Sequence, residues 1–445
     1  MGNQTEFLVG SGIQLYWSTE NAVSCSLQLN GVTIAQNLSA NVDASQGYPV
    51  TVPLVAEAAQ YMLYAYDTTG EYTASLQLTV SVFQFKLLPN PIGNLTKHAS
   101  QTVLRTDGTL YVAGSGLDVV STATNTVIHS IQWPNYEQAT QLTGNSMVMS
   151  PDESQLYVLI ANNYSLTNSQ IQVVNLSNYQ VQSISVPWYL GTIAIGAYNG
   201  KPCLVVTDLA LDGDNMYSSY IYVLDPSNNY GLIQKFALPS LSMFISSAVA
   251  SPQGDRISLC GTYGNTMTDP TGTTLCTYTI ASNTLSEFYF PNTCIFPGNT
   301  FAFSAVSRRY YLGCYRPNAG NNQPEITVID ANTNQIVDTI IPSSDPHIVF
   351  PLITSLVLSP DGLHLYAQLL TIDTDRSISD TIVRINLNTF QVVGTLVSPN
   401  VRFSAWAVKP DGTCLYGVAG DEVSTLYLFE ISDGLNALRE SSAVD

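Results

Sequence analysis

Short runs of alternating apolar and polar residues recur along this chain from about residue 100 onward. Each copy is an apolar strand, a tight polar turn and a second strand rich in aromatic and apolar residues. The clearest copy is Leu356–Leu370, which reads LVLSPDGLHLYAQLL. Copies follow one another at intervals of about 45 to 55 residues, a period that is typical of radial repeat architectures.

Seven such units can be recognised by the turn between their first two strands. A third strand then alternates and ends in Asp or Asn, as in Ile326–Asp330, and a fourth follows, as in Ile336–Ile341. Four short antiparallel strands in each of seven units predict a seven-bladed β-propeller over residues 83–445. The seven turns are Arg105–Gly108, Ser150–Glu153, Ala197–Gly200, Ser251–Gly254, Ser307–Arg309, Ser359–Gly362 and Lys409–Gly412.

The predicted last blade lacks a convincing fourth strand, because Ala437–Asp445 carries charges and does not alternate. The segment Phe83–Pro89 has the pattern of a fourth strand, including the proline that follows that strand in other units. We therefore expect residues 83–89 to complete the last blade, since an unpaired terminal blade would expose sheet edges.

Residues 1–82 have a different pattern, with six or seven short half-buried strands and no copy of the repeat. Asn30-Gly31 is a strong hairpin signal, and Trp17 is the expected core aromatic residue. The segment resembles bacterial immunoglobulin-like domains, which implies a small β-sandwich. The predicted fold class is therefore all-β, a seven-bladed β-propeller with an N-terminal immunoglobulin-like β-sandwich.

The repeat also resembles the YVTN family of propellers, whose units combine Ser-Pro-Asp-Gly, a Tyr-Val strand and a Val-x-Val-Ile-Asp strand. The best matches here are Ser359–Tyr366 and Ile326–Asp330, whereas the third and fifth units differ at the turn. The resemblance covers most of residues 83–445. The wider group includes bacterial surface proteins, lactonases and lyases, so the resemblance implies a fold and leaves function open.

The charge balance narrows the class of partner. Acids outnumber bases 33 to 14, which gives a net charge of −19, although only 11% of residues are charged. Nucleic-acid binding relies on Lys and Arg that displace counterions from phosphates, so no nucleic-acid partner is expected. No apolar run approaches the roughly 18 residues that span a bilayer, and we expect no membrane insertion.

The seven cysteines include no Cys-x-x-Cys pair, and most are interpreted as small buried hydrophobes.

Loops between the second and third strands are long in five units, at 161–169, 208–219, 261–273, 315–323 and 371–380. In a propeller these loops share one face with the connections between blades, and we call it the long-loop face. Long loops on one side of a rigid scaffold are typical of a binding site. The aromatic side chains expected on the long-loop face suit the apolar faces of sugars, and they equally suit a protein interface. The ligand-binding candidates are Trp133, Tyr136, Trp188, Tyr189, His347, Phe350 and Phe403, whereas Phe244, Phe296 and Trp406 are expected to fill gaps between blades.

One segment suggests a metal. Asp208–Asn215 reads DLALDGDN and places carboxylates around a glycine, which suits calcium with Asp212 and Asp214 as ligands. The segment lacks the terminal Glu of an EF-hand loop, so a plain turn is the competing interpretation. Apart from calcium, no cofactor is expected.

No catalytic residue is assigned from the sequence. His129 and His364 fall within predicted strands, which leaves His98 and His347 near the long-loop face. A metal-assisted enzyme could be built from these two histidines with Asp345, but nothing in the spacing requires it. The chain also lacks a Gly-x-Ser-x-Gly elbow and a glycine-rich phosphate loop.

The sequence favours a non-enzymatic recognition or adhesion protein that binds a glycan or a protein through the long-loop face. One alternative is a propeller lactonase or lyase, with or without a metal, that works at the axial channel. Another is a structural subunit of a surface or toxin assembly. Low lysine content and a polar uncharged surface indicate a secreted, periplasmic or cell-surface location, with the leader absent from this chain. The sequence leaves the oligomeric state open.

Overall fold

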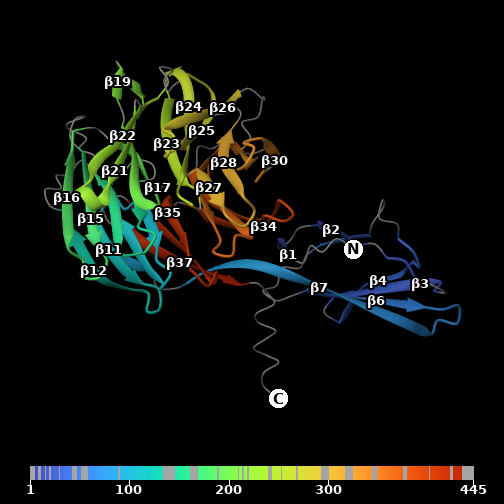
Figure 1. The fold of residues 1–445 in the computed structure, drawn as a ribbon. Coiled ribbons are helices and arrows are strands. Elements are labelled where there is room, and N and C mark those ends of the chain that lie inside the picture. The colour runs from blue at the N-terminus through green and yellow to red at the C-terminus, as the bar shows by residue number, and fades with distance from the viewer. Residues whose placement is uncertain are drawn as a thin grey trace. The chain divides into compact units, whose positions relative to one another are not determined.

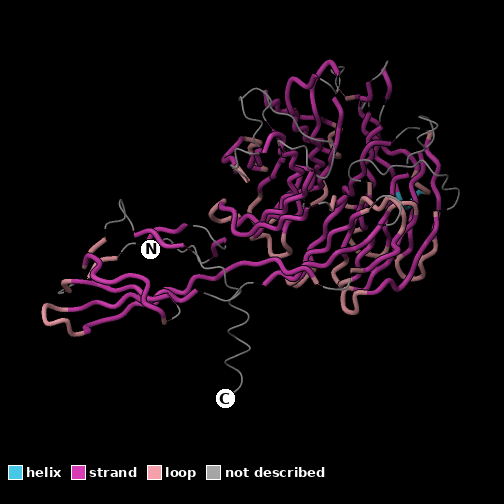
Figure 2. Tube along the Cα trace, turned by 180° about the vertical axis from the view of Figure 1, so that it is seen from behind, coloured by secondary structure: helices cyan, strands magenta, loops and turns pink. Residues whose placement is uncertain are grey.

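The computed structural model describes residues 6–8, 12–15, 17–19, 22–29, 31–42, 48–51, 59–88, 91–133, 146–160, 169–187, 190–208, 210–212, 215–217, 220–238, 243–251, 253–266, 269–291, 300–315, 324–342, 348–373, 378–399, 401–420 and 424–432. Strands dominate these residues, and the one helical element among them is a 3₁₀ turn, η1 (Pro226–Asn228) (Figure 1, Figure 2). The prediction of an all-β fold is confirmed. The chain divides into two compact units, residues 1–86 with 391–395 and 430–445, and residues 87–390 with 396–429.

The first unit is built from strands that the alternating pattern predicted closely. Antiparallel pairing runs in the order β4–β3–β6–β7, while β2 pairs with β5 and β1 runs parallel to β7. Trp17 is buried against Cys25, Leu27 and Tyr61, which confirms its core position. The strands are β1 (Glu6–Leu8), β2 (Gly12–Leu15), β3 (Ser24–Leu29), β4 (Val32–Ser39), β5 (Tyr48–Thr51), β6 (Ala59–Tyr66) and β7 (Tyr72–Leu87).

Within the described residues, the second unit is built on six antiparallel sheets of four strands, each paired in chain order, which makes it propeller-like (Figure 1). The first three sheets are β9 (Gln101–Leu104), β10 (Thr109–Ala113), β11 (Gly116–Ser121) and β12 (Thr126–Gln132); β13 (Met147–Met149), β14 (Gln155–Ile160), β15 (Ser169–Asn175) and β16 (Val181–Val186); and β17 (Leu190–Tyr198), β18 (Lys201–Asp208), β21 (Tyr220–Asp225) and β22 (Gly231–Ala237).

The next three sheets repeat this order. They are β23 (Met243–Ala250), β24 (Arg256–Thr266), β25 (Asp269–Thr279) and β26 (Thr284–Pro291); β27 (Phe301–Ser304), β28 (Arg309–Tyr315), β29 (Pro324–Asp330) and β30 (Ile336–Ile340); and β31 (Ile348–Leu358), β32 (His364–Asp373), β33 (Ile378–Asn386) and β34 (Gln391–Pro399). A further sheet begins β35 (Phe403–Val408), β36 (Cys414–Ala419) and β37 (Ser424–Ser432).

The Ser-Pro-Asp-Gly turns form for a local reason that is visible in the sixth sheet. The Ser359 hydroxyl oxygen accepts the main-chain N–H of His364, and the Asp361 carboxylate accepts that of Leu363. Gly362 has a φ of 70°, a left-handed conformation that glycine adopts without steric cost. Side chains and backbone therefore close the hairpin together, which is why the motif is a clear marker of the units that carry it.

The tyrosines of the repeat are core residues that link neighbouring sheets. The Tyr416 hydroxyl donates to the Asn125 side-chain oxygen at 3.3 Å, joining the last sheet to the first. The Ser258 hydroxyl donates to that of Tyr310 at 2.7 Å, joining the fourth sheet to the fifth. Burial raises the pKa of Tyr310 and of Tyr416 above the ordinary value of a phenol, so both stay neutral at physiological pH.

The sheet that begins with β35 is extended by chain from the start of the second unit. The main-chain nitrogen of Leu88 donates to the Leu428 carbonyl at 2.8 Å, and β8 (Ile92–Leu95) pairs antiparallel with β37. The fourth position of this sheet is thus filled, over these residues, by the segment that precedes the first four-stranded sheet. That residues 83–89 as a whole supply the closing strand stays a prediction, and Ala437–Asp445 lies outside the described residues.

We predict that Leu88→Pro lowers the free energy of unfolding by about 3 kcal/mol, because proline removes the N–H that bonds Leu428. Leu88→Ala is the matched control, since it keeps this N–H while shortening a side chain that packs on the neighbouring core. Urea unfolding of both variants separates the two contributions. Equal losses in the two variants would show that this hydrogen bond does not hold the sheet together.

Candidate functional site

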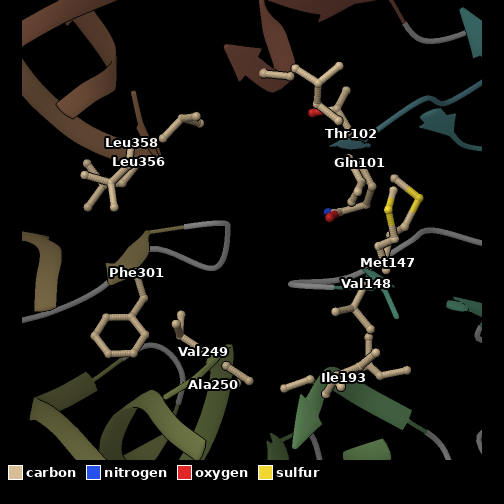
Figure 3. Close-up of a pocket in the computed structure, with 18 of the residues that line it drawn as sticks. Gln101, Thr102, Met147, Val148, Ile193, Val249, Ala250, Phe301, Leu356 and Leu358 are labelled. Carbon is tan, nitrogen blue, oxygen red and sulfur yellow. The ribbon is translucent and has the colours of Figure 1, made fainter. Parts of the chain in front are cut away.

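The innermost strands of the second unit surround one cavity of about 570 Å³ (Figure 3). Its walls come from β9, β13, β17, β23, β27, β31 and β35, each of which ends the order of its sheet. An end strand pairs on one side only, so its other edge leaves backbone N–H and C=O groups without a strand partner. The cavity is therefore bounded by sheet edges as well as by side chains.

None of the described side chains that line this cavity carries a charge. Among the lining residues, Gln101 and Thr102 are polar, and the rest are Val, Leu, Ile, Ala, Met, Pro, Phe and Trp. In Figure 3 the Gln101 amide points into the open space between the strands. Acid–base or nucleophilic catalysis needs a titratable or nucleophilic group within reach of the substrate. The lining residues offer neither an acid, a base nor a thiol.

Two of the predicted ligand-binding residues are core side chains in this structure. Trp133 is 4% exposed, and its indole N–H donates to the Gly114 carbonyl at 2.9 Å. Phe403 is 6% exposed, and its ring lies 4.3 Å from that of Trp406. A ring buried to this extent offers a ligand little surface, and ligand binding by Trp133 and Phe403 stays a prediction.

The other predicted residues fall where the structure describes little or nothing. Tyr136, Trp188, Tyr189, His347 and Asp345 lie outside the described residues. Phe350 is placed by its backbone, which pairs with Ile372 across β31 and β32. Their roles in binding stay predictions.

The calcium candidates are described only in part. Asp212 pairs with Asn215 through the backbone of the small hairpin β19 (Ala210–Asp212) and β20 (Asn215–Tyr217), and Asp214 lies outside the described residues. The described part of the chain shows no cluster of three or more His, Cys, Asp or Glu that could hold a metal ion. Calcium binding by Asp212 and Asp214 stays a prediction.

Of the three histidines that the structure describes, two lie at the surface and one lies in the core. His98 is exposed and has a φ of 51°, and His129 is exposed with its ring stacked 4.5 Å from that of Tyr179. His364 is 7% exposed, and its Nδ1 lies 3.2 Å from a guanidinium nitrogen of Arg384. None of these three residues lines the axial cavity.

Three of the predicted long loops contain paired strands, which in two cases extend the strands of a four-stranded sheet. β24 and β25 continue as a paired hairpin across most of residues 261–273, and β32 and β33 do so at either side of residues 374–377. The third is the β19–β20 hairpin within residues 208–219. Their polar composition hid this pairing, because the backbone forms these ladders without the apolar alternation that a sequence pattern detects.

A buried polar network near the start of β33 has no signal in the sequence pattern. Asp380 is 1% exposed, and its Oδ2 accepts the Gln368 amide at 2.9 Å and the main-chain N–H of Phe403. The Gln368 side-chain oxygen in turn accepts the indole N–H of Trp406 at 2.9 Å. The network ties β32 and β33 to β35, the inner strand of the next sheet. Burial raises the pKa of Asp380 despite these donors.

No protein-family model and no curated protein sequence matches this chain. None of the helices in the described residues is long and apolar enough to cross a membrane.

Proposed function

We propose that this protein is a non-enzymatic, extracytoplasmic recognition protein that binds a glycan or another protein through its long-loop face. The observation that carries the proposal is the uncharged lining of the axial cavity. An enzyme of this architecture would be expected to place its acid, base or metal ligands at the axis, and the lining residues there supply none. Hydrophobic and amide side chains with open backbone edges suit binding without chemistry.

We further propose that the second unit is a seven-bladed, YVTN-type β-propeller. Seven end strands line one cavity, and hydrogen bonds from Thr102 to the Trp406 carbonyl and from Ser404 to the Ala99 carbonyl join the first sheet to β35. These contacts support a closed ring. An immunoglobulin-like fold for the first unit is supported by its four-stranded sheet and by the buried Trp17. In this proposal the first unit serves as a spacer or a second contact.

We predict that Trp188→Ala and Tyr136→Ala each weaken ligand binding at least tenfold, because aromatic rings supply much of the contact energy in binding sites. A glycan array identifies the ligand, and calorimetry with that ligand measures both variants. Tyr289→Ala is the matched control, since this ring is 47% exposed on the outer strand β26. Unchanged affinity in both test variants would contradict binding through these aromatic residues.

A further inference from the structure

A second hollow of about 480 Å³ lies away from the axis, between the outer strands of the second and third four-stranded sheets. We call it the inter-sheet groove. One wall is β16 with Pro187 after it, and the other is formed by the turn before β22 and the start of that strand. The lining residues include Gln182, Ser183, Ser185, Asn229, Tyr230 and Leu232.

The described lining of the groove consists of hydroxyl, amide and apolar side chains with no charged residue, in a chain whose net charge is −19. The side chains of Gln182, Ser185 and Asn229 are exposed and make no hydrogen bond to another described residue. The Ser183 hydroxyl donates to Gln172 at 2.7 Å, which leaves its oxygen free to accept. The groove thus offers several neutral donors and acceptors to a ligand.

An aromatic ring is fixed at this groove by an unusual turn. Asn229 and Tyr230 both have left-handed backbones, with φ of 48° and 59°. This conformation is costly for a bulky residue such as tyrosine. The corresponding turns of the other five four-stranded sheets each have a single left-handed non-glycine residue, which is Asn125, Tyr179, Asn283, Asn334 or Phe390, so the pair of such residues is what sets this turn apart.

The ring of Tyr230 is half-buried, and its centroid lies 6.3 Å from that of Tyr157 in an edge-on contact. Packing against the core on one side holds the ring in place beside the groove, and Leu232, which is 51% exposed, lies two residues further along. The groove therefore combines an immobilised aromatic ring, an exposed aliphatic side chain and neutral hydrogen-bonding groups.

We propose that the inter-sheet groove binds a neutral oligosaccharide. A sugar presents apolar ring faces, which pack on aromatic and aliphatic side chains, and hydroxyls, which bond to amides and other hydroxyls. A lining without cations gives an anionic saccharide no partner for its charge. The proposal does not rest on the long-loop face, because neither Trp133 nor Phe403, the two candidates of that face whose side chains are described, lines this groove.

The test uses calorimetry of the full chain with hexasaccharides of glucose, mannose, galactose and N-acetylglucosamine. We expect one of these to bind, and the combination of Gln182→Ala with Asn229→Gly to weaken binding at least tenfold. Glycine keeps the left-handed backbone at position 229 while it removes the amide. Asn334→Gly is the matched control, because it makes the same change at an equivalent turn outside the groove, and it should leave the affinity unchanged.

Hydrogen–deuterium exchange locates the bound sugar. Protection of residues 182–187 and 229–232 by the hexasaccharide supports the proposal, whereas protection confined to other segments overturns it. The absence of binding by all four hexasaccharides, or equal affinity in the double variant and its control, also overturns it. If an uncharged Ser/Thr/Val peptide protects the groove from exchange and no sugar does, the groove is instead a sheet edge to which a peptide adds as a further strand. Loss of binding in Trp188→Ala with no effect of the double variant would support only the long-loop face.

Discussion

Replacing Trp406 by alanine is expected to lower the free energy of unfolding by about 4 kcal/mol. The side chain is 6% exposed, and its ring packs against Phe403 and Phe429, with centroids 4.3 and 5.8 Å away. Its indole N–H donates to Gln368 of the sixth sheet, and its carbonyl accepts the hydroxyl of Thr102 in the first. The substitution therefore opens a cavity where three sheets meet, and leaves a buried amide oxygen without its donor.

Two variants separate these contributions to stability. Trp406→Phe keeps one six-membered ring and removes the indole N–H together with the rest of the fused ring, so we expect a smaller loss of about 2 kcal/mol. Tyr289→Ala removes an exposed ring of the outer strand β26, and we expect a change within about 0.5 kcal/mol. Urea unfolding followed by circular dichroism measures all three variants. A loss below about 1 kcal/mol in Trp406→Ala would show that this junction does not hold the sheets together.

The second large effect on stability is expected at Asp380, where the alanine and asparagine substitutions should differ sharply in the free energy of unfolding. Asp380→Ala removes the acceptor for the main-chain N–H of Phe403 and for the Gln368 amide, so we expect a loss of about 3 kcal/mol. Asp380→Asn keeps a side-chain oxygen for these donors and removes the buried charge. The Oδ1 atom of Asp380 is buried with no hydrogen-bond partner, which makes the ionised form costly here. We therefore expect the asparagine variant to be at least as stable as the parent at pH 7.

The difference in stability between Asp380→Asn and the parent should depend on pH, and the pKa of Asp380 sets the direction of that change. Burial raises the pKa of Asp380 above its ordinary value, and the Phe403 and Gln368 donors offset only part of that effect. The folded protein therefore holds this proton more tightly than the unfolded chain does. The stabilisation from Asp380 is fully present below the unfolded pKa of about 4 and is lost as the pH rises through the folded pKa. The advantage of Asp380→Asn should thus grow as the pH rises from about 4 to 7, and urea midpoints across that range measure it. A constant or shrinking difference would contradict the raised pKa.

Local chemistry explains which parts of the fold could be predicted from the sequence. The turn Ser359–Gly362 closes through its own side chains, and strands such as Ile326–Asp330 are rich in β-branched residues, which are buried in this structure. Trp17 could be assigned to a core because it is a large aromatic residue within an alternating strand. Each of these signals lies within a few residues along the chain, where no distant contact is needed to read it.

The residues of the candidate site were harder to predict from the sequence, because the exposed fraction of a side chain depends on contacts between distant segments. Trp133 and Phe403 occur in connecting segments like those of exposed aromatic residues, yet each packs into a core between sheets. Asp380 occurs in a polar stretch typical of a surface loop, and its partner Phe403 is 23 residues away. Likewise, nothing in the local pattern sets Gln182 and Asn229 beside one groove, because each belongs to a different sheet.

The sequence by itself determined the strands, their turns and the repetition of one hairpin-rich unit, since these follow from side-chain alternation and local hydrogen bonding. Only the tertiary structure decided which strand of each unit faces the axis, and hence that the shared cavity is lined by uncharged residues. It also decided that Asp380 is a buried acceptor and that an uncharged groove lies between β16 and β22. The reason is physical: alternation fixes which residues share a face of a strand, whereas the neighbour that covers this face is set by sheets that pack together across long stretches of chain.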